Sequence, residues 1–592
     1  MSHTKILDRW AGQVEGDGRA PAVTTPDRVW SRRELAEFAS GLRAALAAGE
    51  GPARGGPVLV ACADPVAVMA TILACAAAGR AFAPVDVRQP AARWTAILED
   101  LGPDHVVCDA AGRAALEGCD TGEAVRIDAE AVGAEARSAR AWRVDDWSAL
   151  GVPDGGYVYF TSGTTGRPKG IRGGLTAVAH FLDWEAEELR VGPGTRVSLL
   201  TSPGFDAFLR DALLPLCVGG TVEVAGSGGV PVGAALAAWL EERAVEVLHC
   251  VPTVFRTLRS AGLTAGSLPG LRAVLLAGEP VRAADVAWWR GLFGDTKELV
   301  NLYGPSETTM TKVFHRLTAE DAVAETVPVG RPMPGVEIRV LLAGKPVTGA
   351  IGEVELRTPF PLGGYLDGSA GGFREGDRFR TGDLGRLRED GVLEVLGRRD
   401  QQVKVNGVRI ELGEVEDVLR RHPGVRDACA AAVEEPGAEA VLCAYVVADG
   451  VTDEDLRAHT AAGLAPGSRP SVYVRLASVP RTLNGKTDRR ALPLPSAAHA
   501  GDSGQAPLDG LESEIAAIWS ELLHLPGIGR DDDFTLLGGD SLAIARLLDR
   551  LRTRFAVDVP VGAFVKRPTV SGLAAVITDG RDGHPGAARS TR

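Results

Sequence analysis

Short strand-like runs alternate with helical stretches along much of the chain, and this alternation limits the possible folds most strongly. The apolar run 57–61 is followed by an alanine-rich helical stretch at 67–78 and by a second strand-like run at 81–86. Two strands joined by a helix need a crossover connection, and such a connection gives parallel neighbours in one sheet. The pattern therefore predicts an α/β fold.

The same order returns after residue 190. Strand-like runs occupy 197–200, 221–224, 245–248 and 273–276, and helical stretches begin at Ala207, Val232 and Thr253. We therefore expect two α/β subdomains in the first 300 residues.

A loop of small and hydroxyl residues, Thr-Ser-Gly-Thr-Thr-Gly-Arg-Pro-Lys-Gly at 161–170, lies between these two regions and follows the apolar run 157–160. Glycines let backbone N–H groups turn toward an anion, the hydroxyls add donors, and Lys169 adds a positive charge. The loop differs from a Walker loop, because Pro168 precedes the lysine and no Ser or Thr follows it. We interpret it as a phosphate-binding loop; the alternative is a flexible surface turn.

The chain length and the net charge limit which classes of function are possible. A chain of 592 residues is too long for one core, and its net charge of −13 disfavours nucleic acid as the main partner. The eight cysteines form no metal-ligand or disulfide pattern, and no apolar run approaches 18 residues. We expect a multidomain cytoplasmic protein with no membrane partner.

The pattern of the sequence changes after residue 325. Short strands and Gly/Pro turns at 325–397 predict a small β-rich unit, and a helix at 412–422 with a strand at 441–447 predicts a small α+β unit. Residues 493–510 are rich in Ala, Gly, Ser, Pro and Asp and are typical of a linker. Apolar stripes at helical spacing after Leu511 predict a helical bundle.

Five further motifs follow the phosphate loop in order: 301–308 (Asn-Leu-Tyr-Gly-Pro-Ser-Glu-Thr), 379–384 (Phe-Arg-Thr-Gly-Asp-Leu), 397–404, 409–414 and 484–489 (Asn-Gly-Lys-Thr-Asp-Arg). Together they resemble the adenylation domains of nonribosomal peptide synthetases, within the wider family of acyl-CoA synthetases and luciferases. The stretch 532–542, which contains Gly-Gly-Asp-Ser, resembles a peptidyl carrier domain.

The resemblance implies the following domain boundaries: an adenylation core at 1–398, a C-terminal lid subdomain at 399–495, a linker at 496–510, a peptidyl carrier domain at 511–578 and a disordered tail at 579–592. The core would hold the two α/β subdomains and the β-rich unit, the lid would be the small α+β unit, and the carrier would be the helical bundle.

The resemblance also implies an enzymatic reaction. An amino-acid carboxylate would attack the α-phosphate of ATP to give aminoacyl-AMP and pyrophosphate, and the aminoacyl group would then pass to a thiol. Lys169 would contact the triphosphate, Glu307 would bind Mg²⁺, Tyr303 would stack on adenine, and Asp383 would bind the ribose beside Arg398. The implied nucleotide-binding residues are Thr161, Ser162, Gly163, Thr164, Thr165, Gly166, Tyr303, Asp383 and Arg398.

Three residues of the C-terminal part would complete the reaction. Lys486 would stabilise the charge that develops near the α-phosphate, and Asp400 matches the hinge about which the lid rotates between the two half-reactions. This rotation would withdraw Lys486 and bring the segment near Gly407 to the site. The accepting thiol would belong to 4'-phosphopantetheine attached to Ser541.

The resemblance assigns a substrate pocket as well. Asp206 would pair with the α-ammonium of an amino acid, although Phe208 stands where the family usually has Ser. The pocket positions are Asp206, Ala207, Arg210, His249, Leu275, Ala277, Leu302, Met310 and Thr311. Arg210 and His249 favour a polar or acidic substrate side chain, because a buried guanidinium needs a partner. If Arg210 instead points to solvent, the pocket is apolar and suits a proline-like or apolar amino acid.

Two further alternatives stay open at this point: an acyl-CoA ligase with an appended helical domain, and an inactive carrier or docking scaffold. The implied partners are the amino-acid substrate, a phosphopantetheinyl transferase and downstream condensation or tailoring enzymes. The sequence leaves open which amino acid is used, which product is made, whether a small activator protein is needed, and the oligomeric state.

Overall fold

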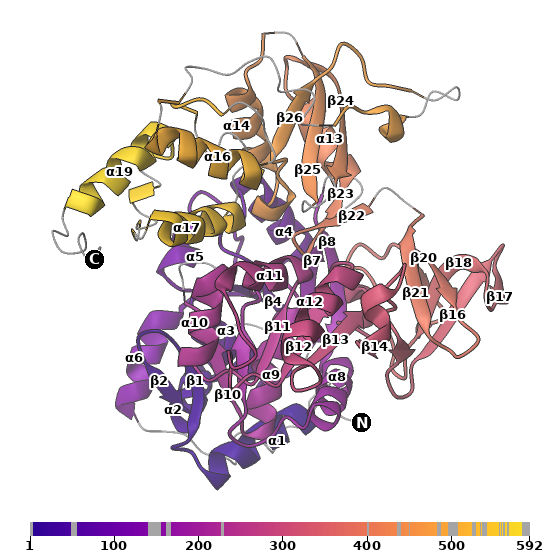
Figure 1. Ribbon diagram of the computed structural model, residues 1–592. Helices are drawn as coiled ribbons and strands as arrows, with labels where there is room; N and C mark the ends of the chain where they lie inside the picture. Colours follow the sequence, from indigo (N-terminus) through magenta and orange to yellow (C-terminus); the bar gives the residue numbers. More distant parts are fainter. Residues whose placement is uncertain are drawn as a thin grey trace.

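The structure is a computed structural model that describes residues 4–48, 56–139, 156–161, 167–226, 230–399, 402–434, 440–448, 450–481, 487–494, 507–508, 510–523, 528–532, 534, 541–555, 557, 559, 563–564 and 567–582. Figure 1 shows a large N-terminal body, an orange subdomain above it, and the yellow C-terminal helices beside that subdomain.

Two sheets form the body, as the alternating pattern predicts. The six-stranded sheet has the order β6-β5-β3-β4-β7-β8, and its first four strands are parallel neighbours. Its strands are β3 (Val58–Ala61), β4 (Phe82–Pro84), β5 (His105–Cys108), β6 (Val125–Asp128), β7 (Gly156–Thr161) and β8 (Lys169–Gly174).

The second sheet has nine strands in the order β15-β14-β13-β12-β11-β9-β10-β1-β2. Its strands are β1 (Pro21–Thr24), β2 (Val29–Ser31), β9 (Arg196–Leu199), β10 (Thr221–Val224), β11 (Val247–Cys250), β12 (Ala273–Ala277), β13 (Glu298–Tyr303), β14 (Val313–Arg316) and β15 (Arg331–Pro332). The chain enters this sheet with β1 and β2, forms the other sheet, and then returns.

Helices join and cover the two sheets. They are α1 (Thr4–Gly16), α2 (Arg32–Ala47), α3 (Pro65–Ala77), α4 (Ala91–Leu101), α5 (Ala110–Ala115), α6 (Ala129–Ala139), α8 (Leu175–Glu188), α9 (Ala207–Val218), α10 (Gly233–Glu242), α11 (Pro252–Thr257) and α12 (Ala283–Phe293). Ser31 caps α2, since its side chain accepts a hydrogen bond from the backbone N–H of Glu34.

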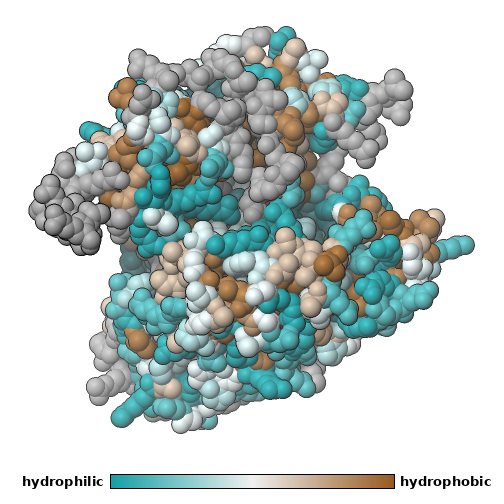
Figure 2. All heavy atoms as spheres, in the orientation of Figure 1, coloured by the Kyte–Doolittle hydropathy of each residue, from teal (hydrophilic) through white to brown (hydrophobic). Residues whose placement is uncertain are grey.

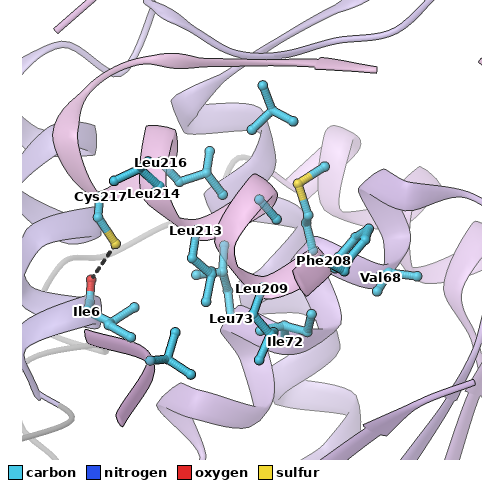
Figure 3. Close-up of a cluster of buried hydrophobic side chains, with 14 of the residues drawn as sticks. Ile6, Val68, Ile72, Leu73, Phe208, Leu209, Leu213, Leu214, Leu216 and Cys217 are labelled. Atoms are coloured by element: carbon cyan, nitrogen blue, oxygen red, sulfur yellow. Dashed lines mark hydrogen bonds between the residues drawn. The ribbon is translucent and has the colours of Figure 1, made fainter. Parts of the chain in front are cut away.

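The main hydrophobic core contains residues of α3 and α9. These two helices pack on different sheets. In Figure 3, Phe208, Leu209 and Leu213 of α9 face Val68, Ile72 and Leu73 of α3, and Cys217 donates a hydrogen bond to the Ile6 carbonyl oxygen. Burying one such side chain contributes about 1.5–3 kcal/mol. The packing therefore fixes the two subdomains against each other, and Phe208 is a core residue.

The β-rich unit follows as predicted. It is a six-stranded sheet in the order β17-β16-β18-β20-β19, with β21 paired to β20. Its strands are β16 (Glu337–Leu342), β17 (Lys345–Val347), β18 (Ile351–Arg357), β19 (Phe373–Arg374), β20 (Arg378–Leu387) and β21 (Leu393–Arg398).

The small α+β unit begins with a two-stranded hairpin, β22 (Gln402–Val405) and β23 (Val408–Glu411). A three-stranded sheet follows, formed by β24 (Val425–Val433), β25 (Val441–Ala448) and β26 (Val472–Arg475), with the helices α13 (Leu412–Arg420) and α14 (Asp453–Gly463). The hydroxyl of Tyr445 donates to the Pro493 carbonyl oxygen and so holds the end of this unit against its sheet.

The C-terminal helices are α16 (Leu511–Leu523), α17 (Ser541–Phe555) and α19 (Val570–Asp582), which share one apolar core that includes Trp519, Phe534 and Leu547. The prediction that a disordered tail begins at residue 579 is wrong for its first four residues, because α19 continues to Asp582. The loss of apolar periodicity after residue 578 predicts disorder, but these polar residues extend the same helix. Residues 583–592 lie outside the described part.

The surface offers no extended apolar face in the view of Figure 2, where apolar residues form separate groups among hydrophilic ones. Among the helices that the structure describes, none combines the length and apolar character needed to span a bilayer.

Candidate active site

The phosphate loop connects β7 and β8, which pair in antiparallel register with Thr161 opposite Lys169. The predicted nucleotide-binding residues Ser162, Gly163, Thr164, Thr165 and Gly166 lie outside the described residues. The Nζ atom of Lys169 lies 3.6 Å from the ring centroid of Tyr365, a cation–π contact. The lysine is therefore held at the base of the loop by an aromatic ring that follows the β-rich strand β18.

Tyr303, Asp383 and Arg398 form one connected group, although 95 residues separate the first from the last in sequence. The Tyr303 hydroxyl donates to Asp383 Oδ2 at 2.5 Å, and Arg398 donates to Asp383 Oδ1 at 2.8 Å. Asp383 and Arg398 are directly opposite on β20 and β21, while Tyr303 ends β13. The structure thus brings together the three residues assigned to adenine and ribose.

Glu307 is a buried carboxylate between the body and the small α+β unit. It accepts hydrogen bonds from the Tyr365 hydroxyl at 2.8 Å and from Arg409 Nη1, which lies 2.9 Å from both carboxylate oxygens. Burial alone would raise the pKa of Glu307, but the Arg409 guanidinium outweighs it and holds the pKa below its usual value. Glu307 is therefore ionised and already has a cationic partner.

Among the described residues, no group of three or more His, Cys, Asp or Glu side chains is arranged to hold a metal ion. A single carboxylate such as Glu307 suits Mg²⁺ only when phosphate oxygens and waters supply the other ligands.

Asp206 lies directly before α9, and its Oδ2 accepts a hydrogen bond from the backbone N–H of Met310 at 3.1 Å. Burial raises the pKa of Asp206, and the Met310 N–H partly offsets this effect. Thr309 and Met310 both have positive φ angles, of 65° and 56°. A strained turn therefore presents Met310 to Asp206, as is common at binding sites.

The other predicted pocket residues come from neighbouring strand ends. His249 and Leu275 are partners across β11 and β12, and Ala277 and Leu302 are partners across β12 and β13. Such carboxyl ends of parallel strands usually form the ligand-binding edge of an α/β sheet. The side chains of these residues and of Asp206, Ala207, Met310 and Thr311 are buried or half-buried.

Arg210 and His249 belong to a fully buried charged cluster with Asp211 and Glu185. Arg210 Nε donates to Asp211 Oδ1 at 2.7 Å, while His249 Nε2 lies 2.5 Å from Glu185 Oε1 and its Nδ1 lies 3.1 Å from Asp211 Oδ1. Burial and Arg210 oppose protonation of His249, but the two carboxylates outweigh them and raise its pKa. Two basic side chains thus contact two acidic ones in this cluster.

Arg210 is 5% exposed and does not point to solvent, so the solvent-facing orientation considered for it is wrong. Its partner Asp211 is the next residue of the same helix. The local sequence alone does not show whether the arginine pairs with this neighbour inside the protein or faces solvent. Among the described residues, none accepts a hydrogen bond from its two terminal nitrogens, Nη1 and Nη2. These two donors remain available to a ligand.

The β22–β23 hairpin reaches into the same region. The Cα atom of Gly407 lies 3.6 Å from the position that a Cβ on Gly278 would take, and a Cβ on Gly407 itself would overlap Val251. Gly407 also has φ +76°, which favours glycine. The hairpin tip thus packs against the ends of β11 and β12, and Arg409 reaches Glu307 from there.

A buried ion pair holds the small unit on the body. Arg93 of α4 donates to Glu414 of α13 at 2.7 Å, and both side chains are almost fully buried. Lys486 and Asp400 lie outside the described residues. Ser541 begins α17, which contacts α10; its own side chain is outside the described part.

Sequence reasoning missed Tyr365, Asp211 and Glu185, and assigned no separate role to Arg409. Tyr365 and Glu185 carry no local motif, because their roles arise from contacts with residues 58 and 64 positions away. Arg409 lies inside the motif 409–414 and could have been singled out as a cation entering the site.

Comparison with known families matches three parts of the chain. Residues 10–366 match the AMP-binding enzyme family, residues 414–486 match the AMP-binding enzyme C-terminal domain, and residues 513–577 match the phosphopantetheine attachment site. The three families follow one another along the chain in the order that the motifs indicate.

Among curated proteins, the chain is 35% identical to phosphinothricin tripeptide synthetase PhsC of Streptomyces viridochromogenes, over 93% of this chain and 51% of the relative. It is 31% identical to surfactin synthase subunit 2 of Bacillus subtilis, over 94% of this chain and 16% of the relative. The chain thus spans about half of the length of the first relative and about a sixth of the length of the second.

Among solved structures, the fold matches that of an NRPS protein containing adenylation and PCP domains bound to a vinylsulfonamide inhibitor. The TM-score is 0.78 at 22% identity, with 97% of this chain and 96% of that chain covered. The adenylate-forming fold predicted from the motifs, with its β-rich unit, small C-terminal subdomain and helical carrier region, is therefore confirmed.

Proposed function

Because the chain belongs to the AMP-binding enzyme family, as a nonribosomal peptide synthetase adenylation domain with its C-terminal lid and a phosphopantetheine carrier domain, we propose that it activates an amino acid and loads it onto its own carrier. The amino acid and ATP would give aminoacyl-AMP and pyrophosphate. The carrier thiol would then displace AMP and form an aminoacyl thioester.

The observation that carries this proposal is the convergence of distant motif residues on one site. Glu307 of the core meets Arg409 of the lid, while Tyr303 and Arg398 meet on Asp383. Five residues drawn from four separate motifs would not be expected to pair in this way in a scaffold that had lost its nucleotide site. This favours an active enzyme over the inactive docking scaffold.

The roles proposed for the nucleotide site follow from its contacts. Asp383, held by Arg398, would accept hydrogen bonds from the ribose hydroxyls, and Tyr303 would stack on adenine. Residues 161–166 with Lys169 would hold the triphosphate. Glu307 would hold Mg²⁺ with phosphate oxygens once Arg409 withdraws, and the ion would neutralise phosphate charge when bound.

The lid position supports a role in the second half-reaction. The tip at Gly407 packs on Val251 and Arg409 pairs with Glu307, so the hairpin occupies the site where the thiol would arrive. We propose that rotation about Asp400 exchanges this hairpin for Lys486, which would contact the α-phosphate and the carboxylate during adenylation.

The carrier would receive 4'-phosphopantetheine on Ser541 from a phosphopantetheinyl transferase, and the loaded amino acid would pass to downstream condensation or tailoring enzymes. The phosphopantetheine match at 513–577 contains this serine. Together with Asp206, it favours carrier loading over the acyl-CoA ligase alternative, since a soluble thioester needs no carrier.

The substrate that we propose is an amino acid with a polar or acidic side chain. Asp206 would pair with the α-ammonium, and the Nη donors of Arg210 would bind a carbonyl, amide or carboxylate oxygen of the side chain. Because Arg210 already pairs with Asp211, it would accommodate an uncharged acceptor as well as a charged one. A proline-like or apolar substrate would leave these buried donors unpaired, which is costly.

The test is amino-acid-dependent ATP–pyrophosphate exchange over a panel of polar, acidic, cyclic and aliphatic amino acids, with deaminated acids as controls. We expect the highest exchange with a polar or acidic amino acid. Arg210→Met should reduce its kcat/KM by about 10²-fold or more while aliphatic amino acids gain relative to it. A preference of the unchanged protein for proline or an aliphatic residue would contradict the role of Arg210, and activity with deaminated acids would contradict that of Asp206.

A further inference from the structure

The carrier helix α17 contacts α10 of the core. The Asp549 carboxylate lies against Gly233, the first residue of α10, and Oδ2 of Asp549 accepts a hydrogen bond from the Ser260 hydroxyl at 3.5 Å. Its other oxygen accepts from Arg552 of the carrier at 2.9 Å. Asp549 is 7% exposed, so it is buried between the two domains.

The start of α10 suits a carboxylate. The N-cap residue Val232 offers no capping side chain, although the Gly233 N–H donates to Thr257 Oγ1 at 2.9 Å, and the N-terminal end of the helix carries the positive end of the helix dipole. Gly233 has φ +56° and no Cβ, and a Cβ at this position would overlap the Asp549 carboxylate. The absence of a side chain at Gly233 is therefore what lets the carboxylate approach.

A second contact sets the direction of α17. Arg546, one turn closer to the start of the helix, donates to the Thr253 carbonyl oxygen at 3.3 Å. Thr253 follows two residues after Val251, on which the hairpin tip at Gly407 packs. Along α17, Arg546 therefore lies nearer to the hairpin than Asp549 does. The Ser541 end of α17 lies in the same direction.

We propose that Asp549 and Arg546 form the surface by which the carrier docks on its own core for loading, and that Gly233 is the core residue that admits it. The docked face would hold the Ser541 end of α17 toward the site already described. The inference rests on the proposed function, because it states how the carrier reaches the adenylate.

The test uses the full-length chain with its phosphopantetheine arm and measures two quantities separately: ATP–pyrophosphate exchange, and the single-turnover rate of carrier loading. Gly233→Ala adds the obstructing methyl group. Its matched control is Gly262→Ala, which imposes the same backbone strain at φ +65° but has nothing within 4 Å of the added Cβ. Asp549→Ala removes the carboxylate, and Arg550→Ala on the same helix, an exposed residue paired with Glu521, is its control.

We expect Gly233→Ala and Asp549→Ala to lower the loading rate by about tenfold or more while exchange stays within about twofold. Both controls should load as the unchanged protein does. The double variant should load no more slowly than the slower single variant, because both changes disrupt one contact.

Equal loading rates in each variant and its control would overturn the proposal, as would additive losses in the double variant. If Gly233→Ala also lost exchange through misfolding, the loading rates of Asp549→Ala and Arg550→Ala alone decide whether the proposal holds. A failure of the proposed function is distinct, because the unchanged protein would then show no exchange or no loading.

Discussion

Lys312 is a buried lysine next in sequence to Thr311 of the proposed substrate pocket, and neither the motifs nor the proposed reaction uses it. It follows Thr311 in sequence, is completely buried, and its Nζ has no hydrogen-bond partner among the described residues. The rings of Phe181 and Phe360 flank it at 5.7 and 5.3 Å. Burial lowers the pKa of Lys312 to about 7, and the charge of Asp206 only partly opposes this effect.

We predict that Lys312→Met raises the free energy of unfolding by about 1–3 kcal/mol near pH 7, because it removes an unpaired buried amine. In the unchanged protein, the unfolded chain binds more protons than the folded one between pH 7 and about 10, so this residue makes stability rise with pH across that window. The variant should lack this rise. Denaturant unfolding at several pH values between 6 and 9 measures both effects.

The control is Lys297→Met. Lys297 is also buried, but its ammonium donates to the Leu268 and Leu271 carbonyl oxygens at 2.6 and 2.9 Å. Its replacement should therefore destabilise the protein. Loss of stability in Lys312→Met at pH 7 would contradict the account of that residue.

At the scale of residues, the sequence predicted those site residues that belong to motifs. Asp383 lies beside Arg398 in the structure as the resemblance implies, and the Tyr303 hydroxyl also donates to Asp383. Partners such as Tyr365 and Glu185 could not be predicted, because they are brought to the site by tertiary packing and carry no local signal of it.

The β22–β23 hairpin is the element that changes the chemistry of the site. Arg409 at its second strand neutralises Glu307, and its tip at Gly407 occupies the space beside Val251. A metal ion and the Arg409 guanidinium cannot both occupy the same face of Glu307. The hairpin position and metal binding at Glu307 are therefore expected to exclude each other.

We predict that Arg409→Ala slows carrier loading by about tenfold or more, since the hairpin loses the ion pair that holds it in the site. ATP–pyrophosphate exchange, which needs the hairpin withdrawn, should change by less than about threefold. Stopped-time loading assays and exchange on the same preparation measure the two steps. Arg399→Ala is the control, because Arg399 is exposed and pairs with Glu353 within the core. Equal losses in both steps would show that Arg409 acts in adenylation as well.

At the scale of elements, strand and helix positions follow from periodicity and caps. The strand 221–224 and the helix from Ala207 begin at the predicted residues, and Ser31 caps α2. The division of the strands between two sheets could not be predicted, because β1 pairs with β10, which follows it by about 200 residues. The end of α19 was missed, since a polar helix end carries no apolar periodicity.

The whole molecule places three parts around one site. The core carries the residues proposed to bind the nucleotide and the substrate, the hairpin of the lid packs at Val251, and α17 contacts α10 through Asp549. The domain order follows from the sequence, whereas the mutual docking rests on single contacts such as Asp549 with Gly233, which no pattern along the chain reveals. This arrangement fits the carrier-loading step.

The central claim is that the chain loads an amino acid onto its own Ser541, and intact-protein mass spectrometry tests it most directly. The phosphopantetheinylated chain, given ATP, Mg²⁺ and the amino acid that gives the highest exchange, should gain the mass of one aminoacyl group. Ser541→Ala should keep exchange and gain no mass, and Lys486→Ala should lose both. A mass gain that persists in Ser541→Ala, or no gain in the fully phosphopantetheinylated chain with active exchange, would contradict the account.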